Sequence, residues 1–394
     1  MAQEAAVVVT KLRLQTLFCG LLSVVVSTTT LAAILPEERA DVMYHLYDGG
    51  GMTIDGTSLL VRKNVADTYS FSANSYVDKV SSASIDVIAS GASEYSEQRD
   101  EYSLTGTYLQ GSMLLNGGYT SSSENDYDAE TLYFNVDQGF FGDLTTFSMG
   151  YSRGSDDVMQ NGNDAFADTI DRQNYRFGLS QILTPNLMMG LHYEAVTEEG
   201  YLNNPYRSYR FLTNPLDINA GFQTATEVYP RTRTSDAATL SASYYFDYRA
   251  SLKFEYRYYT DDWDIKANNY QITYTHTFGE NWIVDIKYRA YQQDQAYFYS
   301  DLFSFASLDE KDFRARDKEL SEFSTQTFGI GISYQIPYFK GGKYIDKSTI
   351  NLQWDHIQFD YDNFRDITQN AAVGEEPLYS FDADVIRFYF SIWY

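Results

Sequence analysis

Apolar and polar residues alternate with a period of two in several segments spread along the chain. Successive side chains of a β-strand point to opposite faces, so this period predicts strands with one apolar and one polar face. The clearest segments are NWIVDIKYRAY and ASLKFEYRYY. Their apolar faces comprise Trp282, Val284, Ile286, Tyr288 and Ala290 in the first, and Ala250, Leu252, Phe254, Tyr256 and Tyr258 in the second. A soluble β-sandwich shows the same alternation, so the period alone does not decide the fold class.

The lengths of the connections favour a barrel over a sandwich. Tight turns fit at 109–112, 183–186, 247–250 and 278–281, and long polar segments lie at about 79–98, 154–169, 198–234, 293–319 and 361–380. Short turns on one rim and long loops on the other are typical of outer-membrane barrels. The alternating runs, each of about ten residues, number sixteen between Val42 and Tyr394. The sequence therefore predicts an all-β fold, a closed antiparallel transmembrane β-barrel of about 16 strands with short periplasmic turns and long extracellular loops.

The last strand, VIRFYFSIWY, is rich in aromatic residues. Phe388, Phe390, Ile392 and Tyr394 share one face, which we expect to contact lipid while the strand closes the barrel against the first one. Such a strand, with an aromatic last residue, also looks like the signal that the barrel-assembly machinery of Gram-negative bacteria reads. An edge strand of a soluble β protein is the alternative.

The N-terminal residues carry a different pattern. Lys11 and Arg13 precede an apolar run that ends in small residues, as in a secretory signal peptide. We predict cleavage after Ala32, which leaves a signal peptide at 1–32 and one barrel domain at 33–394.

Composition excludes several classes of protein. The chain has 54 acidic and 29 basic residues, a net charge of -25, which argues against nucleic-acid binding because that function needs clustered Lys and Arg. The only cysteine, Cys19, lies in the predicted signal peptide, so we expect no disulfide or thiol chemistry in the mature chain. No later segment approaches the roughly 20 apolar residues that a transmembrane helix needs.

The polar faces of the predicted strands carry charges of both signs, and these would line the lumen. They are Lys253, Glu255 and Arg257 on one strand, Asp285, Lys287 and Arg289 on a later one, and Arg387 on the last. Such residues form the wall of a polar channel or a salt-bridged plug. Sixteen strands leave room for water, but inward rings such as Tyr259, Tyr291 and Tyr389 would fill it. Both interpretations stay open.

The longest predicted loop concentrates arginines in an otherwise acidic chain. Arg207, Arg210, Arg231 and Arg233 all lie within 198–234. Guanidinium groups bind phosphates and carboxylates through paired hydrogen bonds, so outer-membrane lipids with lipopolysaccharide phosphates, or an anionic solute, are candidate partners. We favour the alternative, a loop folded into the lumen with its arginines paired to carboxylates of the wall.

Metal binding and catalysis find little support. Two acidic loops offer oxygen ligands for Ca²⁺, but neither has the EF-hand spacing, so we expect a solvated acidic rim and no metal site. The loop ligands would be Asp156, Asp157, Asn163, Asp164 and Asp168. The four histidines lie on distant segments, and no GxSxG or HExxH motif is present. His192 and Glu194 share a strand face, but same-face neighbours arise by default in any strand. We therefore predict no catalytic residue.

Several segments resemble an uncharacterised family of Gram-negative outer-membrane proteins catalogued as a domain of unknown function. They include SANSYVDKVSSASIDVIASGASEYSEQRDEY, NNPYRSYRFL, YRYYTDDWDI and GEEPLYSFDADV, and the likeness covers essentially all of the mature chain. The resemblance implies a barrel without an established activity. Members are often encoded beside a small lipoprotein, a thioredoxin-like protein and a flavin transferase, which implies a lipoprotein or a periplasmic redox protein as partner.

The segment DVIASGAS resembles the acceptor motif of that transferase, in which an Asp precedes S/T-G-A-T and FMN is esterified to the last hydroxyl. The resemblance implies Ser93 as the acceptor and Asp86 as the acidic residue. Here a serine replaces the usual threonine, one extra residue follows Asp86, and the predicted topology places the segment outside, whereas the transferase works in the periplasm. We expect no cofactor, with covalent FMN as the alternative.

These patterns together predict a protein of the outer membrane of a Gram-negative bacterium. We expect either a channel for a small polar solute or a membrane scaffold for a periplasmic partner. A flavin-modified redox protein is the alternative, and a hydrolase at the barrel rim is less favoured.

Overall fold

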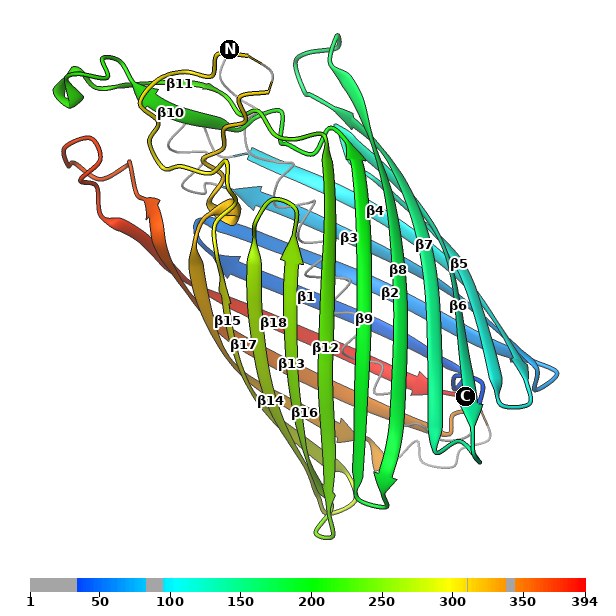
Figure 1. Cartoon of the computed structure of the whole chain (residues 1–394). Helices are drawn as coiled ribbons and strands as arrows, with labels where there is room; N and C mark the ends of the chain where they lie inside the picture. The colour runs from blue at the N-terminus through cyan, green and yellow to red at the C-terminus, as the bar shows by residue number, and fades with distance from the viewer. Residues whose placement is uncertain (1–33, 83–94, 310, 338–343) are drawn as a thin grey trace.

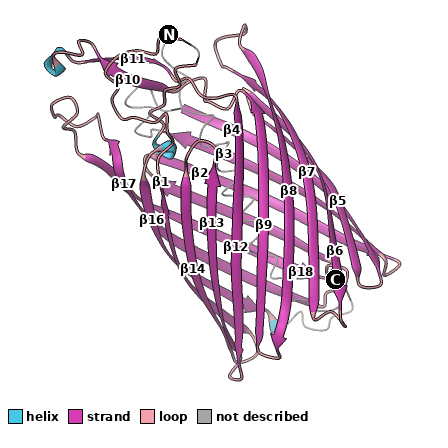
Figure 2. Ribbon diagram, viewed as in Figure 1, coloured by secondary structure: helices cyan, strands magenta, loops and turns pink. Residues whose placement is uncertain are grey.

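The computed structural model describes residues 34–82, 95–309, 311–337 and 344–394. Within these residues sixteen strands form one closed antiparallel barrel, as the alternation predicted (Figure 1). Figure 2 shows that strand makes up nearly all of the regular structure. The barrel strands are β1 (Arg39–Gly49), β2 (Met52–Val65), β3 (Tyr69–Ser82), β4 (Tyr95–Gln110), β5 (Met113–Ser123), β6 (Tyr127–Phe140), β7 (Thr145–Met159), β8 (Ala167–Thr184), β9 (Leu187–Gly200), β12 (Thr232–Phe246), β13 (Ala250–Asp261), β14 (Lys266–Phe278), β15 (Trp282–Gln293), β16 (Phe323–Gln335), β17 (Lys347–Arg365) and β18 (Leu378–Trp393).

The first and last strands close the barrel. β1 pairs with β18 from Arg39 opposite Trp393 to Gly49 opposite Ala383, and Figure 1 shows the blue β1 beside the red β18. Closure leaves no strand of the barrel with an unpaired edge, which is the condition for a sheet to exist in lipid.

Short turns lie at one end of the barrel and long loops at the other. All four predicted turn positions join neighbouring strands, and Gly111 and Gly279 take the positive φ values of 61° and 58° that tight turns need. At the loop-bearing end, long segments follow β9, β15 and β17. The first of them contains a separate hairpin, β10 (Ser208–Leu212) with β11 (Phe222–Thr226).

One predicted loop is mostly strand. We expected a long loop at 154–169, but β7 continues to Met159 and β8 begins at Ala167. The reason is that polar side chains on both faces do not interrupt backbone pairing once a strand has passed beyond the lipid, where its outer face meets water. Strand ends are therefore set by pairing and not by hydropathy.

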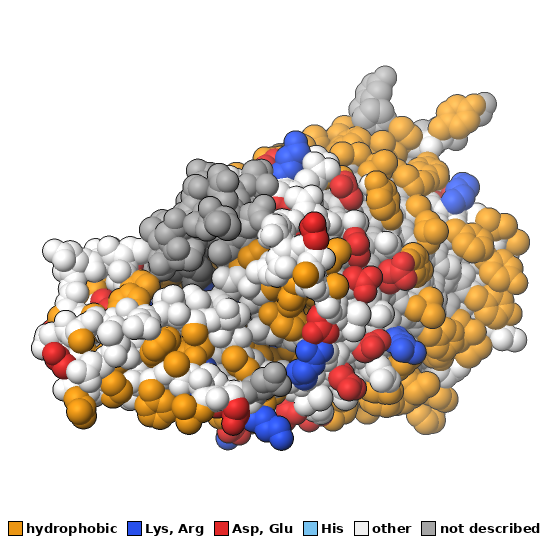
Figure 3. Space-filling model, turned by 90° about the horizontal axis from the view of Figure 1, so that it is seen from above, with side chains coloured by type: hydrophobic (Ala, Val, Ile, Leu, Met, Phe, Trp, Pro, Cys, Tyr) orange, Lys and Arg blue, Asp and Glu red, His pale blue; other side chains and the backbone are white. Residues whose placement is uncertain are grey.

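The two faces of each strand differ as expected. On β15, Ile286 and Tyr288 are about half exposed on the outside, whereas Asp285 and Lys287 point inward. Figure 3 shows hydrophobic side chains over broad areas of the surface, with acidic and basic side chains gathered between them. Exposing apolar surface to water costs about 25 cal/mol per Å², so hydrophobic areas of this extent would be very unfavourable in water. No helix among the described residues is long and apolar enough to cross a membrane.

A hydrophobic core lies inside the loop-bearing end. Inward-facing residues of β6, β7 and β8 pack there against residues from the loops that follow β9 and β15. Its buried members are Tyr127, Ala129, Val158, Ile170, Leu202, Tyr229, Trp263, Ile265, Ala296, Phe298, Tyr299, Ala315 and Leu320. This core fixes the loops over that end of the barrel.

Candidate functional site

The inner wall of the barrel carries the charges that the alternation predicted there. β13 bears Lys253, Glu255 and Arg257, and these alternate with outward Leu252, Phe254 and Tyr258, which are exposed on the outer surface of the barrel. Asp285, Lys287 and Arg289 take the same face on β15, and Arg387 does so on β18. The structure thus brings all seven predicted lumen charges to one inner surface.

Most of these charges form ion pairs within the wall. The ammonium of Lys253 lies 3.0 Å from Glu255, and the guanidinium of Arg257 lies 2.7 Å from Glu194 on β9. Asp355 on β17, which the sequence analysis did not single out, accepts from Lys287 at 2.7 Å. Its position on the inward face of a period-two strand was the available signal.

Water reaches part of this wall. The side chains of Lys253 and Arg257 are 47% and 40% exposed although both point inward. A solid barrel interior would bury them, so there is open space beside β9 and β13. Two of the inward rings lie near the loop-bearing end: Tyr259 packs on the loop core, and Tyr291 lies 5.7 Å from Phe323 between ring centroids.

The loop arginines pair with carboxylates, which is the alternative that we favoured from the sequence. Two of the four, however, pair with carboxylates of other loops and not with those of the wall. Arg207 pairs with Asp317 at 3.1 Å. Arg210 is fully buried and forms ion pairs with Asp301 and Glu376. These carboxylates come from the two other long loops and not from the wall, because the segment between β9 and β12 lies across the loop-bearing end and meets those loops first.

The other two arginines pair at strand ends. Arg231 makes two hydrogen bonds to Asp168 at the start of β8, at 2.7 and 2.8 Å. Arg233 is bound by Asp261 at the end of β13 and lies over the ring of Trp263. All four candidate anion-site arginines thus pair with carboxylates of the same chain.

A buried polar cluster joins the loops that follow β9 and β15. The Glu227 carboxylate is 3% exposed and accepts from the Tyr229 hydroxyl at 2.7 Å and from the backbone N–H of Arg316 at 2.6 Å. Burial, and then repulsion by Asp317, raise the pKa of Glu227 to about 7. Val228 exchanges two backbone hydrogen bonds with Arg314, so the two loops are also linked by their main chains.

Three carboxylates converge on the loop-bearing end of β4 and β6. One oxygen from each of Glu97, Glu124 and Asp126 lies within 4.8 Å of the others. Hard oxygen ligands of this type suit Ca²⁺, so this set could hold a cation on ligand chemistry alone. The acidic residues named from the sequence do not form such a group, since Asp156 pairs with Arg172 and Asp168 with Arg231.

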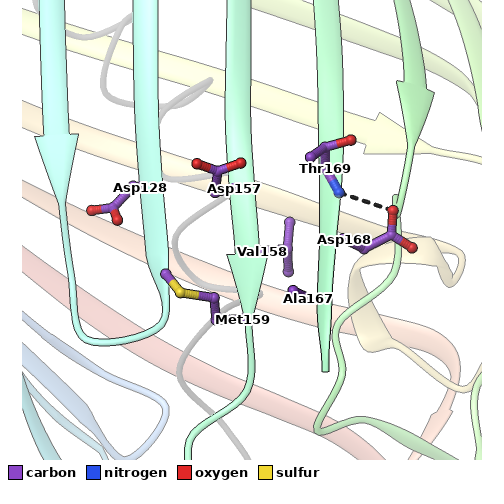
Figure 4. Close-up of a pocket in the computed structure, with 7 residues that line it drawn as sticks. All are labelled: Asp128, Asp157, Val158, Met159, Ala167, Asp168 and Thr169. Atoms are coloured by element: carbon purple, nitrogen blue, oxygen red, sulfur yellow. Dashed lines mark hydrogen bonds between the residues drawn. The ribbon is translucent and has the colours of Figure 1, made fainter. Parts of the chain in front are cut away.

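A shallow cavity of about 260 Å³ lies where β7 ends and where β6 and β8 begin (Figure 4). Val158 and Ala167 are among its lining residues, together with the carboxylates of Asp157 and Asp168. Figure 4 shows Asp168 accepting from the backbone N–H of Thr169, at 2.8 Å. The lining contains neither a histidine nor a cysteine.

The histidines occupy separate parts of the barrel wall. His45 is buried on the inner wall 2.8 Å from Asp78, and His192 faces the lumen from β9. His276 and His356 lie on outward faces, the latter 3.1 Å from Asp384. Ser93 and Asp86, and the predicted signal peptide, lie outside the described residues.

Comparison with known proteins places the chain in a family. Residues 85–352 match the family described as "Protein of unknown function (DUF3570)". The chain belongs to this family. The resemblance noted from the sequence to an uncharacterised outer-membrane family is thereby confirmed for the DUF3570 chain. No curated protein matches it.

Several solved structures are similar to the DUF3570 chain. A bacterial polysaccharide outer membrane secretin is 7% identical, with a TM-score of 0.51 over 91% of this chain and 100% of its own. OpdK of Pseudomonas aeruginosa, solved with vanillate, is 9% identical with a TM-score of 0.43 over 91% and 99%. The toluene transporter TodX of Pseudomonas putida is 10% identical with a TM-score of 0.42 over 95% and 93%. At such identities the likeness concerns the fold alone.

Proposed function

We propose that this DUF3570 protein is an outer-membrane channel for a small polar solute, with its long loops outside the cell. The observation that carries the proposal is the exposure of charged side chains inside the closed wall, above all Lys253 and Arg257. Charges cost several kcal/mol to bury in a dry interior. A protein that keeps them hydrated within a barrel provides a path for polar molecules.

The loops restrict that path. Their buried core and the ion pairs of Arg207 and Arg210 hold them across the loop-bearing end. A large solute would have to displace packed aromatic side chains, whereas water and small ions need only the gaps around them. The proposal therefore concerns small solutes, with lipids and lipopolysaccharide in contact with the outer apolar faces.

Conductance in a planar lipid bilayer tests the channel. Purified, refolded protein is expected to give discrete current steps in potassium chloride. Refolding is checked by the mobility difference between heated and unheated barrel on gels. Persistent silence of correctly folded protein would reject the channel.

A membrane scaffold for a periplasmic partner is the second candidate. The packed loop core favours it, because a barrel sealed at one end transports nothing. The wild-type protein and a variant that lacks the hairpin residues 208–226 together separate the two: a channel restricted by its loops conducts with the hairpin in place, whereas a scaffold sealed by its loop core conducts only after the hairpin is deleted.

A further inference from the structure

Three basic side chains lie on the inner wall formed by β15 to β18, and two of them share one carboxylate. The ammonium of Lys287 lies 2.7 Å from one oxygen of Asp355. The guanidinium of Arg387 lies 3.3 Å from the other oxygen. The third basic residue is Arg289, two positions along β15 and on the same face as Lys287.

Arg289 has no ion pair with any described residue. Its Nε donates to the side-chain oxygen of Asn269 at 3.1 Å. Lys287 and Arg289 share one face of β15, and Arg387 reaches the same carboxylate as Lys287, so the three cations face one region of the inner wall. Asp355 pairs with both Lys287 and Arg387, whereas Arg289 has no carboxylate within ion-pair distance among the described residues.

A glycine on β16 makes room for this arrangement. Gly329 stands between Lys287 on β15 and Asp355 on β17 in the strand register. A Cβ added to Gly329 would lie 2.1 Å from an oxygen of Asp355 and 2.8 Å from Cε of Lys287. The missing side chain lets the ion pair lie flat across β16, which holds the basic groups against the wall.

The basic groups are the more exposed members of the inward pairs. The side chain of Lys287 is 22% exposed and that of Asp355 is 8% exposed. Arg257 and Glu194 show the same order, at 40% and 26%. At these two pairs a solute inside the barrel therefore meets the cation before the carboxylate, although the chain as a whole carries a net charge of -25.

We propose that Lys287, Arg289 and Arg387 form a binding site for small oxyanions on the lumen wall, and that this site makes the channel select solutes that carry a carboxylate or a phosphate group. The inference rests on the proposed channel and names its substrate class. Two guanidinium groups beside an ammonium present donors that match the oxygens of either group. An anion would supply the charge that Asp355 alone does not.

The reversal potential in a potassium chloride gradient tests the selectivity. The wild-type channel is expected to pass chloride more readily than potassium, and Arg289→Gln combined with Arg387→Gln should lower this permeability ratio at least about threefold, since a ring of charge sets ion selectivity. Both changes keep Lys287 paired with Asp355. Arg153→Gln is the matched control, because Arg153 is 65% exposed on the outward face of β7. Its permeability ratio should equal that of wild type.

Inorganic phosphate and succinate then distinguish the two oxyanion classes. Each is expected to reduce the chloride current of the wild type at lower concentration than that of the double variant. A cation-selective wild type, or a ratio that the double variant leaves unchanged, overturns the inference while the channel stands. If the folded protein conducts nothing, the channel is rejected, and calorimetric titration with phosphate still decides the site: binding lost in the double variant supports it, and no binding by wild type refutes it.

Discussion

At the scale of single residues, Gly329 is a position at which one added methyl group would disturb an ion pair of the inner wall. The space where its Cβ would stand is taken by the ion pair of Lys287 and Asp355. Gly331 on the same strand is different, since an added Cβ would meet its nearest neighbour, an oxygen of Asp285, at 3.3 Å. The two glycines share a face and a strand, which makes them a matched pair.

Gly329→Ala is therefore expected to lower the free energy of unfolding by about 1–3 kcal/mol, the usual cost of overpacking. Gly331→Ala should change it by less than about 1 kcal/mol, because the neighbouring side chain needs to move only slightly. Urea unfolding from lipid vesicles, followed by tryptophan fluorescence, measures both. Equal losses in the two variants would contradict the role assigned to the ion pair.

Glu227 gives the loops a pH dependence. Its pKa is about 7 when the loops are docked, above the ordinary value of 4.5. The docked state therefore holds a proton that the undocked state releases. Docking is strongest below pH 4.5, weakens as the pH rises toward 7, and then stays constant.

Protease cleavage within residues 201–231 is accordingly expected to be faster at pH 8 than at pH 5, after correction for the protease's own pH profile on an unfolded peptide. Glu227→Gln should remove most of this difference, since an amide does not titrate. Glu375→Gln, at an exposed position in another loop, should leave it intact. An unchanged pH dependence in the Glu227 variant would reject the assignment.

At the scale of elements, Arg210 connects three long loops. Its guanidinium reaches Asp301 after β15 and Glu376 after β17, and the side chain is only 1% exposed. Removing one partner of a buried pair costs about 3–5 kcal/mol, because the remaining charges lose their compensation. Arg231, in contrast, is 60% exposed in its pair with Asp168. Exposed pairs contribute about 0–1 kcal/mol.

Arg210→Ala should consequently loosen the loops and increase both conductance and protease cleavage, whereas Arg231→Ala should have little effect on either. Single-channel recording and limited proteolysis of the same preparations provide the measurements. If both variants behaved alike, the buried pair would not be what holds the loops.

At the scale of the whole molecule, the two surfaces of the wall tolerate opposite substitutions. Ile286 faces outward on β15 and is about half exposed, while Gln271 faces inward on β14 beside Glu255. A charge on the lipid face costs about 2–4 kcal/mol near the bilayer midplane. Ile286→Arg should therefore reduce folding into vesicles, and Gln271→Arg should be tolerated because it can pair with Glu255. The heat-dependent gel shift reports the folded fraction of each.

The inner wall could be predicted from the sequence because a strand has a period of two and lipid accepts only one of its faces. This is why Lys253 and Arg257 can be assigned to the inward face of their strand without any long-range information. The partners of Arg207 and Arg210 could not be predicted, since Asp301, Asp317 and Glu376 lie roughly 90 to 170 residues away along the chain. Loop sequences have no regular period of apolar and polar residues, so the sequence of one loop does not indicate which other loop it contacts.

The sequence by itself determined the barrel, the number of its strands and the face on which each wall residue stands, because alternation and closure of the backbone hydrogen bonds are repeated in every strand. Only the tertiary structure decided which charges meet. Asp355 forms ion pairs with two basic residues, and Arg289 forms only a hydrogen bond with Asn269 among the described residues. Those outcomes depend on strand register and loop packing, which bring together residues that are distant along the chain.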